Sequence, residues 1–160
     1  MMRTTLVAIA GAALLAAATV PRLVGEAPRP RAAVAEESGT HTLFADRGGH
    51  FWADAMVDGT HVSFLVDTGA TMIVLTGEDA RRIGIDVDAL AYRRKVATAN
   101  GVIPVAEVRI PEVEVGGIGI RNVDALVPQL DGLETSLLGM NFLKRLSRFE
   151  IDGNRMVLVE

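Results

Sequence analysis

The sequence of 160 residues contains no cysteine, which excludes disulfides, thiol nucleophiles and cysteine metal ligands. Aromatic residues are scarce, at 4%, so a surface that stacks nucleic-acid bases is not expected. The sequence also has fewer basic than acidic residues, with 16 Lys and Arg against 20 Asp and Glu. The composition therefore argues against a nucleic-acid partner. Apolar residues, by contrast, make up 49% and suffice for the core of one domain.

The N-terminus carries a long apolar run behind a short basic start. Residues 4–20 contain no charge and follow Arg3, which predicts a hydrophobic helix over residues 1–20 that acts as a signal-anchor or transmembrane segment. A signal peptide cleaved near Ala16–Ala18 and a buried helix of a soluble protein remain alternatives. Residues 21–40 are rich in proline and predict a flexible linker, and residues 41–160 the folded domain.

This organisation predicts where the domain lies. In a bacterium, a retained anchor would make a single-pass protein of the inner (cytoplasmic) membrane with its domain on the periplasmic side. Cleavage would instead release the domain as a periplasmic or secreted protein.

Short strand-like runs joined by glycine turns dominate the domain. Residues 50–66 predict a hairpin that turns at Asp58-Gly59, and residues 93–110 predict a second one that turns at Asn100-Gly101. Further strands are expected at 112–115, 118–127, 149–151 and 156–159, with helices from a Thr76 cap to Gly84 and over 141–146. The pattern predicts a mainly β fold, a closed or nearly closed barrel with one or two short helices.

Several common catalytic constellations are missing from the sequence. None of its serines lies in a G-x-S-x-G elbow, and it contains no H-E-x-x-H. The histidines His41, His50 and His61 lack the spacing of metal ligands. We therefore expect no metal and no cofactor.

One carboxylate stands out by its place in the pattern. Asp67 follows the apolar run Phe64-Leu65-Val66 directly and is followed by Thr68 and Gly69. Such a position puts a carboxylate where a strand ends and the backbone turns sharply. The simplest interpretation is an Asx turn, since a lone Asp-Thr-Gly is a weak signal.

The second half of the domain echoes the first. Residues 50–70 lead to one short helix, and residues 109–130 lead through Leu137-Leu138-Gly139 to another. With these motifs the chain resembles the retropepsin-like aspartic proteases, and among them the bacterial members with one such domain behind an N-terminal anchor. The resemblance covers residues 41–160 and comprises the Asp-Thr-Gly-Ala-Thr block, the Asn-Gly hairpin and the Leu-Leu-Gly-x-Asn block. It departs at residues 149–160, which add a hairpin beyond the last strand of the short viral enzymes.

The resemblance implies a retropepsin-like closed barrel with a flap hairpin and the activity of an aspartic endopeptidase. Asp67 would activate water, Thr68 would brace the two active-site loops, and Gly69 would let the backbone approach the carboxylates. Residues 97–104 would form the flap over a protein or peptide substrate. The implied substrate-binding residues are Ala70, Thr98, Ala99, Asn100 and Gly101, and the supporting residues are Leu137, Leu138 and Gly139.

The chain contains one Asp-Thr-Gly, whereas peptide hydrolysis by this chemistry uses two carboxylates that share a proton. Because Leu137-Leu138-Gly139 supplies no carboxylate, we expect a homodimer in which Asp67 faces its symmetry mate. Two alternatives stay open. One is a catalytically silent dimeric barrel that binds extended peptides by strand addition, and the other is an unrelated β domain in which Asp67 only caps a turn.

Overall fold

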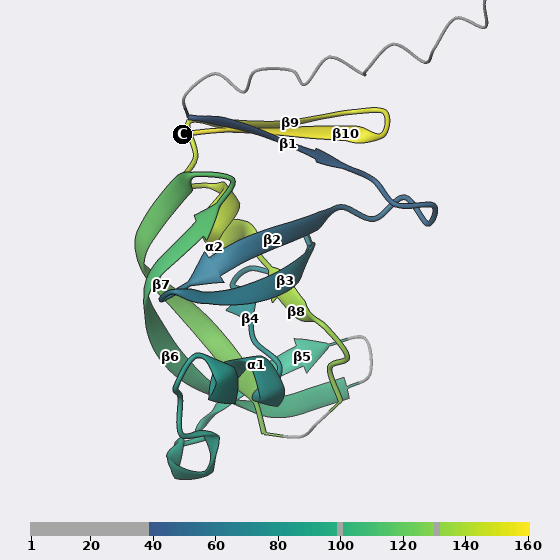
Figure 1. Cartoon of the computed structure of the whole chain (residues 1–160). Coiled ribbons are helices and arrows are strands. Elements are labelled where there is room, and N and C mark those ends of the chain that lie inside the picture. Colours follow the sequence, from purple (N-terminus) through teal and green to yellow (C-terminus); the bar gives the residue numbers. More distant parts are fainter. Residues whose placement is uncertain (1–38, 99–100, 130–131) are drawn as a thin grey trace, which may run out of the picture. The chain divides into compact units, whose positions relative to one another are not determined.

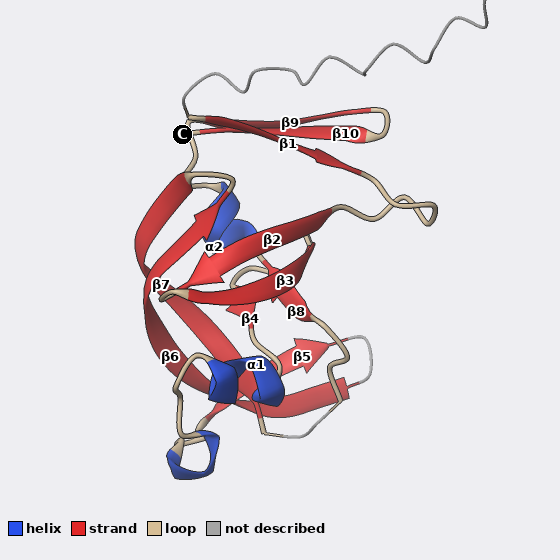
Figure 2. Cartoon of the chain, in the orientation of Figure 1, coloured by secondary structure: helices blue, strands red, loops and turns tan. Residues whose placement is uncertain are grey.

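The structure is a computed structural model that describes residues 39–98, 101–129 and 132–160. Strands make up most of it, and the helices are short (Figures 1 and 2). The mainly β prediction is therefore confirmed. The predicted N-terminal hydrophobic helix and linker, at 1–20 and 21–40, fall almost entirely outside the described residues. In the part of the chain that is described, no helix combines the length and apolarity needed to span a membrane.

Six strands close into a barrel. In order around the ring they are β2 (Trp52–Val57), β3 (Thr60–Val66), β8 (Ser136–Leu138), β4 (Ile73–Val74), β7 (Ile118–Pro128) and β6 (Gly101–Val115). The ring closes because β6 pairs with β7 on one side and with β2 on the other. Strand β5 (Arg94–Thr98) extends the sheet beyond β6.

The predicted hairpins are present, and alternating burial shows why their sequences form strands. Along β2, exposed and buried residues alternate strictly, so one face packs into the barrel. Asp58 and Gly59 join β2 to β3 with φ values of 46° and 81°, the left-handed pair that a tight hairpin turn requires. Strands β5 and β6 form the second hairpin, whose connecting residues 99–100 lie outside the described residues. Gly101 begins β6, so it is a strand residue here and not part of the turn.

Strand β6 differs from the sequence prediction, because it runs unbroken for 15 residues instead of ending before a separate strand at 112–115. Pro111 lies between two paired positions, Ile110 opposite Val123 and Glu112 opposite Arg121. A proline cannot donate to the ladder, and Asn122 across from it takes a positive φ of 52°. The pairing of β6 with β7 is therefore irregular at Pro111, and β6 continues beyond it.

Two short helices pack on the barrel. Helix α1 (Gly77–Arg82) begins at the predicted cap, where the Thr76 hydroxyl accepts a hydrogen bond from the Asp79 N–H at 3.0 Å. Buried Ser136 completes this cap, because its hydroxyl accepts from the Thr76 N–H at 3.0 Å and donates to the Asp79 carboxylate at 2.6 Å. Helix α2 (Met140–Leu143) is shorter than the predicted 141–146. A 3-10 turn, η1 (Val87–Ala89), follows α1.

The first strand and the last two strands of the described residues form a separate three-stranded sheet. Its order is β1 (Thr40–Phe44), β10 (Arg155–Val159), β9 (Arg148–Asp152). The predicted C-terminal hairpin is thereby confirmed, and β1 completes the sheet. Leu43, Met156 and Leu158 are buried and belong to the same apolar core as the barrel. The His41 ring of β1 lies against Gly116, where a Cβ would clash with it.

The loop between β1 and β2 is organised by one carboxylate, that of Asp46. Its Oδ1 accepts from the N–H groups of Gly48 and His50 at 2.7 and 3.0 Å, and its Oδ2 accepts from the Trp52 indole at 2.9 Å. The indole bond and the His50 amide bond lower the pKa of Asp46 from 3.8 to about 2, although the side chain is exposed. This loop leads into the strand that pairs with the end of β3.

The depressed pKa predicts how the loop responds to acid. The bonds to Asp46 are present above its unfolded pKa near 4 and are lost as the pH falls through about 2. Trp52 is the only tryptophan, so its fluorescence should change with a midpoint near pH 2 while the far-UV circular dichroism follows the barrel itself. Asp46→Asn should remove this step. A midpoint near pH 4, or the same step in the variant, would contradict the assignment.

Candidate active site

The loop that follows β3 presents the carboxylate singled out by the sequence. Asp67 is half-buried, and its Oδ1 accepts a hydrogen bond from the Gly69 N–H at 2.8 Å, which is an Asx turn. The Ala70 N–H closes the turn on the Asp67 carbonyl at 3.2 Å. Thr68 and Gly69 are exposed. The turn thus holds one carboxylate oxygen against its own backbone and presents the tripeptide at the surface.

Gly69 lies close to the Asp67 carboxylate. A Cβ at this position would lie 3.1 Å from Asp67 Oδ1, tighter than nine in ten real Cβ contacts. Any side chain would therefore push on the carboxylate that the turn is holding. The turn places the Gly69 backbone beside the Asp67 carboxylate.

Strand β8 supports the loop that bears Asp67. It runs parallel to β3, with Leu65 opposite Leu137 and Val66 opposite Leu138, and the Asp67 N–H donates to the Leu138 carbonyl at 3.1 Å. The predicted supporting segment Leu137-Leu138-Gly139 therefore lies beside the Asp-Thr-Gly segment, although 70 positions separate them in the chain.

Gly139 lies very close to the backbone of the loop that bears Asp67. A Cβ built on it would lie 2.2 Å from the Met72 carbonyl oxygen and 3.0 Å from that of Ala70. Its φ of −89° is open to any residue, so the requirement for glycine comes from contact and not from backbone conformation. The residues after it then bind the loop, because the Met140 and Asn141 N–H groups donate to the Ala70 and Thr71 carbonyls at 2.8 and 3.1 Å.

A cavity of about 280 Å³ lies next to this segment, under the β5–β6 hairpin. Val96, Thr98 and Ile103 line it from the hairpin, and Leu137 lines it from β8. The remaining lining residues include Val74, Leu126, Pro128 and Leu133, so the walls are almost entirely apolar. The hairpin and the loop that bears Asp67 are also tied at their bases, where Arg94 contacts the Met72 sulfur at 3.5 Å and the Glu107 carboxylate at 3.2 Å.

The residues expected to bind substrate are therefore in two places. Ala70 belongs to the Asp67 loop and its carbonyl is bonded to Met140, whereas Thr98 and Gly101 belong to the β5–β6 hairpin. The Thr98 hydroxyl donates to the Gly101 carbonyl at 2.9 Å, across the hairpin end. Ala99 and Asn100 lie outside the described residues.

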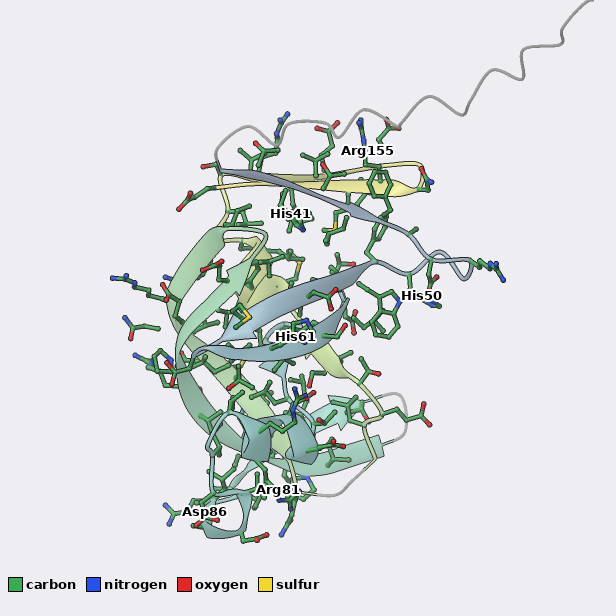
Figure 3. The ribbon with its side chains drawn as sticks, in the orientation of Figure 1. His41, His50, His61, Arg81, Asp86 and Arg155 are labelled. Carbon is green, nitrogen blue, oxygen red and sulfur yellow. The ribbon has the colours of Figure 1, made fainter. Side chains whose placement is uncertain are left out.

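The three histidines lie in separate places. Figure 3 shows His41 between the terminal sheet and the barrel, His50 on the loop before β2, and His61 on β3. Within residues 39–98, 101–129 and 132–160, no group of three or more His, Asp or Glu side chains is placed to hold a metal ion.

Sequence reasoning missed Asn141. Its carboxamide accepts from the Ile73 N–H at 2.9 Å and donates to the Asp124 carbonyl at 2.6 Å, so it touches the end of the Asp67 loop. The sequence contained one signal that could have pointed to Asn141. It is the polar residue of the Leu-Leu-Gly-x-Asn block, at the start of an apolar helix. The apolar cavity was missed as well, because its walls come from five separate strands and a loop.

Comparison with known proteins agrees with this geometry. Residues 53–145 match the family model described as "gag-polyprotein putative aspartyl protease". The crystal structure of a retropepsin-like aspartic protease from Rickettsia conorii superposes with a TM-score of 0.70 at 38% identity, over 76% of this chain and 91% of that one. The chain therefore belongs to the retropepsin-like aspartic protease family.

Two longer bacterial proteins are also similar. An uncharacterized protein encoded in the cobV 5′ region of a Sinorhizobium species is 44% identical over 110 residues, and an uncharacterized protein of Rickettsia prowazekii is 40% identical over 110 residues. Each match covers 69% of this chain and 47% of the relative. The chain thus spans about half the length of these curated relatives.

The contact at Gly139 gives a direct test of the architecture. Gly139→Ala should destabilise the domain by about 3 kcal/mol or more, because the new methyl group meets backbone atoms that cannot turn aside. Gly119→Ala is the matched control, since a Cβ there meets only the end of the flexible Glu112 side chain at 3.4 Å. Urea unfolding should place the control within about 0.5 kcal/mol of wild type. Equal stability of the two variants would refute the close approach.

Proposed function

We propose that this protein is an aspartic endopeptidase, which hydrolyses peptide bonds by water activated between two Asp67 carboxylates. The observation that supports this most is the Asp67 turn, in which a barrel strand, the Gly69 amide and the Gly139 contact together hold one carboxylate at the surface. Rigid support of this kind is what positions a catalytic group. The adjacent apolar cavity under a hairpin supplies a place for substrate.

The proposed reaction needs two carboxylates that share a single proton. The ionised carboxylate takes a proton from water as the water oxygen attacks the peptide carbonyl carbon, while the protonated one gives its proton to the carbonyl oxygen. The tetrahedral intermediate then collapses, the C–N bond breaks, and the amine leaves with a proton. No covalent bond to the protein forms.

The second carboxylate is proposed to come from a second copy of the chain. The segment that matches Asp67-Thr68-Gly69 in the second half is Leu137-Leu138-Gly139, which contains no carboxylate. At Gly139 a Cβ would also clash with the Met72 carbonyl oxygen. A two-fold homodimer would bring two Asp67-Thr68-Gly69 turns together, with Thr68 bracing one loop against the other.

The β5–β6 hairpin is the proposed flap, residues 97–104. We assign substrate binding to Thr98, Ala99, Asn100 and Gly101 on the flap and to Ala70 beside the carboxylate. A flap of this kind excludes water from the scissile bond and aligns it.

We also propose that residues 1–20 anchor the protein in the inner membrane, and that residues 21–40 link the anchor to a protease domain on the periplasmic side. The uncharged run after Arg3 supports this placement. Removal of the segment as a signal peptide is the alternative. Confinement to a membrane surface would favour the encounter of two copies.

Mixing of chains tests the enzyme and the dimer together. Asp67→Asn alone should show no peptide cleavage. An equal mixture of wild-type and Asp67→Asn chains, after full subunit exchange, should give about a quarter of the all-wild-type activity per chain, because only about one dimer in four holds both aspartates. Cleavage is measured on a peptide library, and subunit exchange is followed by the masses of the mixed and unmixed dimers.

Asp54→Asn is the matched control for this experiment, since Asp54 is an exposed aspartate on the outer side of β2. It should keep full activity. Half activity in the mixture would mean that one Asp67 is enough and would rule out the shared dyad. Undiminished cleavage by Asp67→Asn would rule out the aspartic protease, and peptide binding without any cleavage by wild type would favour the silent barrel.

The cavity predicts the preferred substrate side chain. Because Val96, Ile103 and Leu133 line it, peptides with Leu or Phe beside the scissile bond should be cleaved at least about tenfold more efficiently than peptides with Lys or Asp there. Leu133→Ala enlarges the cavity and should raise the ratio of kcat/KM for Phe over Leu several-fold. The control Met56→Ala, which removes an exposed apolar side chain near the far end of β2, should not change that ratio. An unchanged ratio in Leu133→Ala would argue against the cavity as a subsite.

A further inference from the structure

One rung of the barrel ladder involves a side chain, and this rung lies at the end of the Asp67 loop. Strand β4 runs parallel to β7, with Ile73 opposite Ala125, and the Leu75 N–H donates to the Leu126 carbonyl at 2.9 Å. In a parallel ladder the donors of one strand recur at every second residue, as do the acceptors of its neighbour. The preceding rung should therefore join the Ile73 N–H to the Asp124 carbonyl.

A side chain bridges the two groups of that rung. The Ile73 N–H donates to Asn141 Oδ1 at 2.9 Å, and Asn141 Nδ2 donates to the Asp124 carbonyl at 2.6 Å. Two hydrogen bonds through one carboxamide thus connect the start of β4 to β7.

Asparagine suits this place because its carboxamide has the same donor and acceptor as a peptide group. Leucine has neither, and an ionised aspartate keeps the acceptor but turns an oxygen toward the Asp124 carbonyl. The backbone of Asn141 is fixed independently, since its N–H donates to the Thr71 carbonyl at 3.1 Å. The Asp124 carboxylate is engaged elsewhere, by Arg109 at 2.7 Å.

The loop that bears Asp67 therefore has two supports. Its first end is held by strand bonds, Val66 N–H to the Phe51 carbonyl at 2.9 Å and Asp67 N–H to the Leu138 carbonyl at 3.1 Å. Its second end, at Ile73, is held by the Asn141 side chain. We propose that Asn141 is a positioning residue, which sets the orientation of the Asp67 carboxylate by bridging Ile73 to Asp124. This inference rests on the proposed peptidase function.

The Asn141 carboxamide bonds to the Ile73 N–H and the Asp124 carbonyl. The charged groups on the neighbouring elements are Asp67 on the loop, Asp124 on β7, its partner Arg109 on β6, and Lys144 and Arg145 beside α2. The Arg145 guanidinium donates to the carbonyl of residue 121 at 2.6 Å. A carboxyl group introduced at position 141 would thus face the Asp124 carbonyl at close range. Such a neighbour favours the protonated form and raises the pKa of the new group.

Two substitutions in the full chain separate positioning from folding. Asn141→Leu removes both bonds and should lower kcat about 10- to 100-fold with little change in KM, at every pH. Asn141→Asp should be close to wild type in acid, where the carboxylic acid donates to Asp124 and accepts from Ile73. Its kcat relative to wild type should then fall as the pH rises through the raised pKa.

Val113→Ala is the control for stability, because Val113 is a buried core residue of β6 at the far end of the barrel from Asp67. It should lower the melting temperature but leave kcat per folded chain unchanged. A merely structural role for Asn141 predicts the same behaviour for all three variants. An unchanged kcat in Asn141→Leu, or a ratio for Asn141→Asp that is flat with pH, would overturn the proposal.

Amide hydrogen exchange tests the bridge without reference to catalysis. Asn141→Leu should increase exchange at Ile73 and along residues 67–72, with no change in β9 and β10. Asn141→Asp should protect Ile73 in acid and release the loop at neutral pH. If wild type cleaves no peptide but this pattern is found, the proposed function fails and the bridge stands. If wild type cleaves peptides but both variants exchange the Ile73 amide at the wild-type rate, the bridge is wrong and the proposed function stands.

Discussion

The close approach of two backbones at Gly139 is the constraint on which the site depends. The Met72 and Ala70 carbonyls lie where a side chain would otherwise be, so the Asp67 loop rests directly on β8. This contact allows the hydrogen bonds from Met140 and Asn141 to reach the loop carbonyls. A loop held by backbone contacts on both sides loses little further freedom when substrate binds, which is how preorganised sites reduce the cost of catalysis.

The barrel provides the rigidity behind that contact. Phe64, Leu138 and Phe142 are fully buried in one core and come from the strand before Asp67, the strand beneath it and the helix after Gly139. Because close-packed cores deform little, the relative positions of these three elements are fixed before any substrate arrives. Ser136 extends the same support to α1, since its hydroxyl joins the start of β8 to the helix cap.

The features that could be predicted from the sequence are those that neighbouring residues encode. Asp58-Gly59, the Thr76 cap and the apolar run before Asp67 each contain their own structural signal, and the structure has each of them where expected. The resemblance in the Asp-Thr-Gly block and the Leu-Leu-Gly block predicted the family correctly.

Features that depend on distant partners could not be predicted in this way. Strands β4 and β8 have two and three residues and exist only because β3 and β7 pair with them. The continuity of β6 through Pro111 depends on the conformation of Asn122 in the neighbouring strand. Asn141 and Ser136 act through bonds to residues 17 to 68 positions away, which no local pattern reveals.

The two halves of the domain differ at one decisive position. After Val66 the chain continues with a carboxylate that turns back on Gly69, whereas after Leu138 it continues with a glycine pressed against the first loop. Position 139 therefore has no room for a side chain, because its backbone packs against the loop that it supports. Leu137-Leu138-Gly139 supplies no second carboxylate from the same chain. The proposed dyad would thus draw its second carboxylate from another chain that presents its own supported turn, and two identical turns that face each other are related by a two-fold axis.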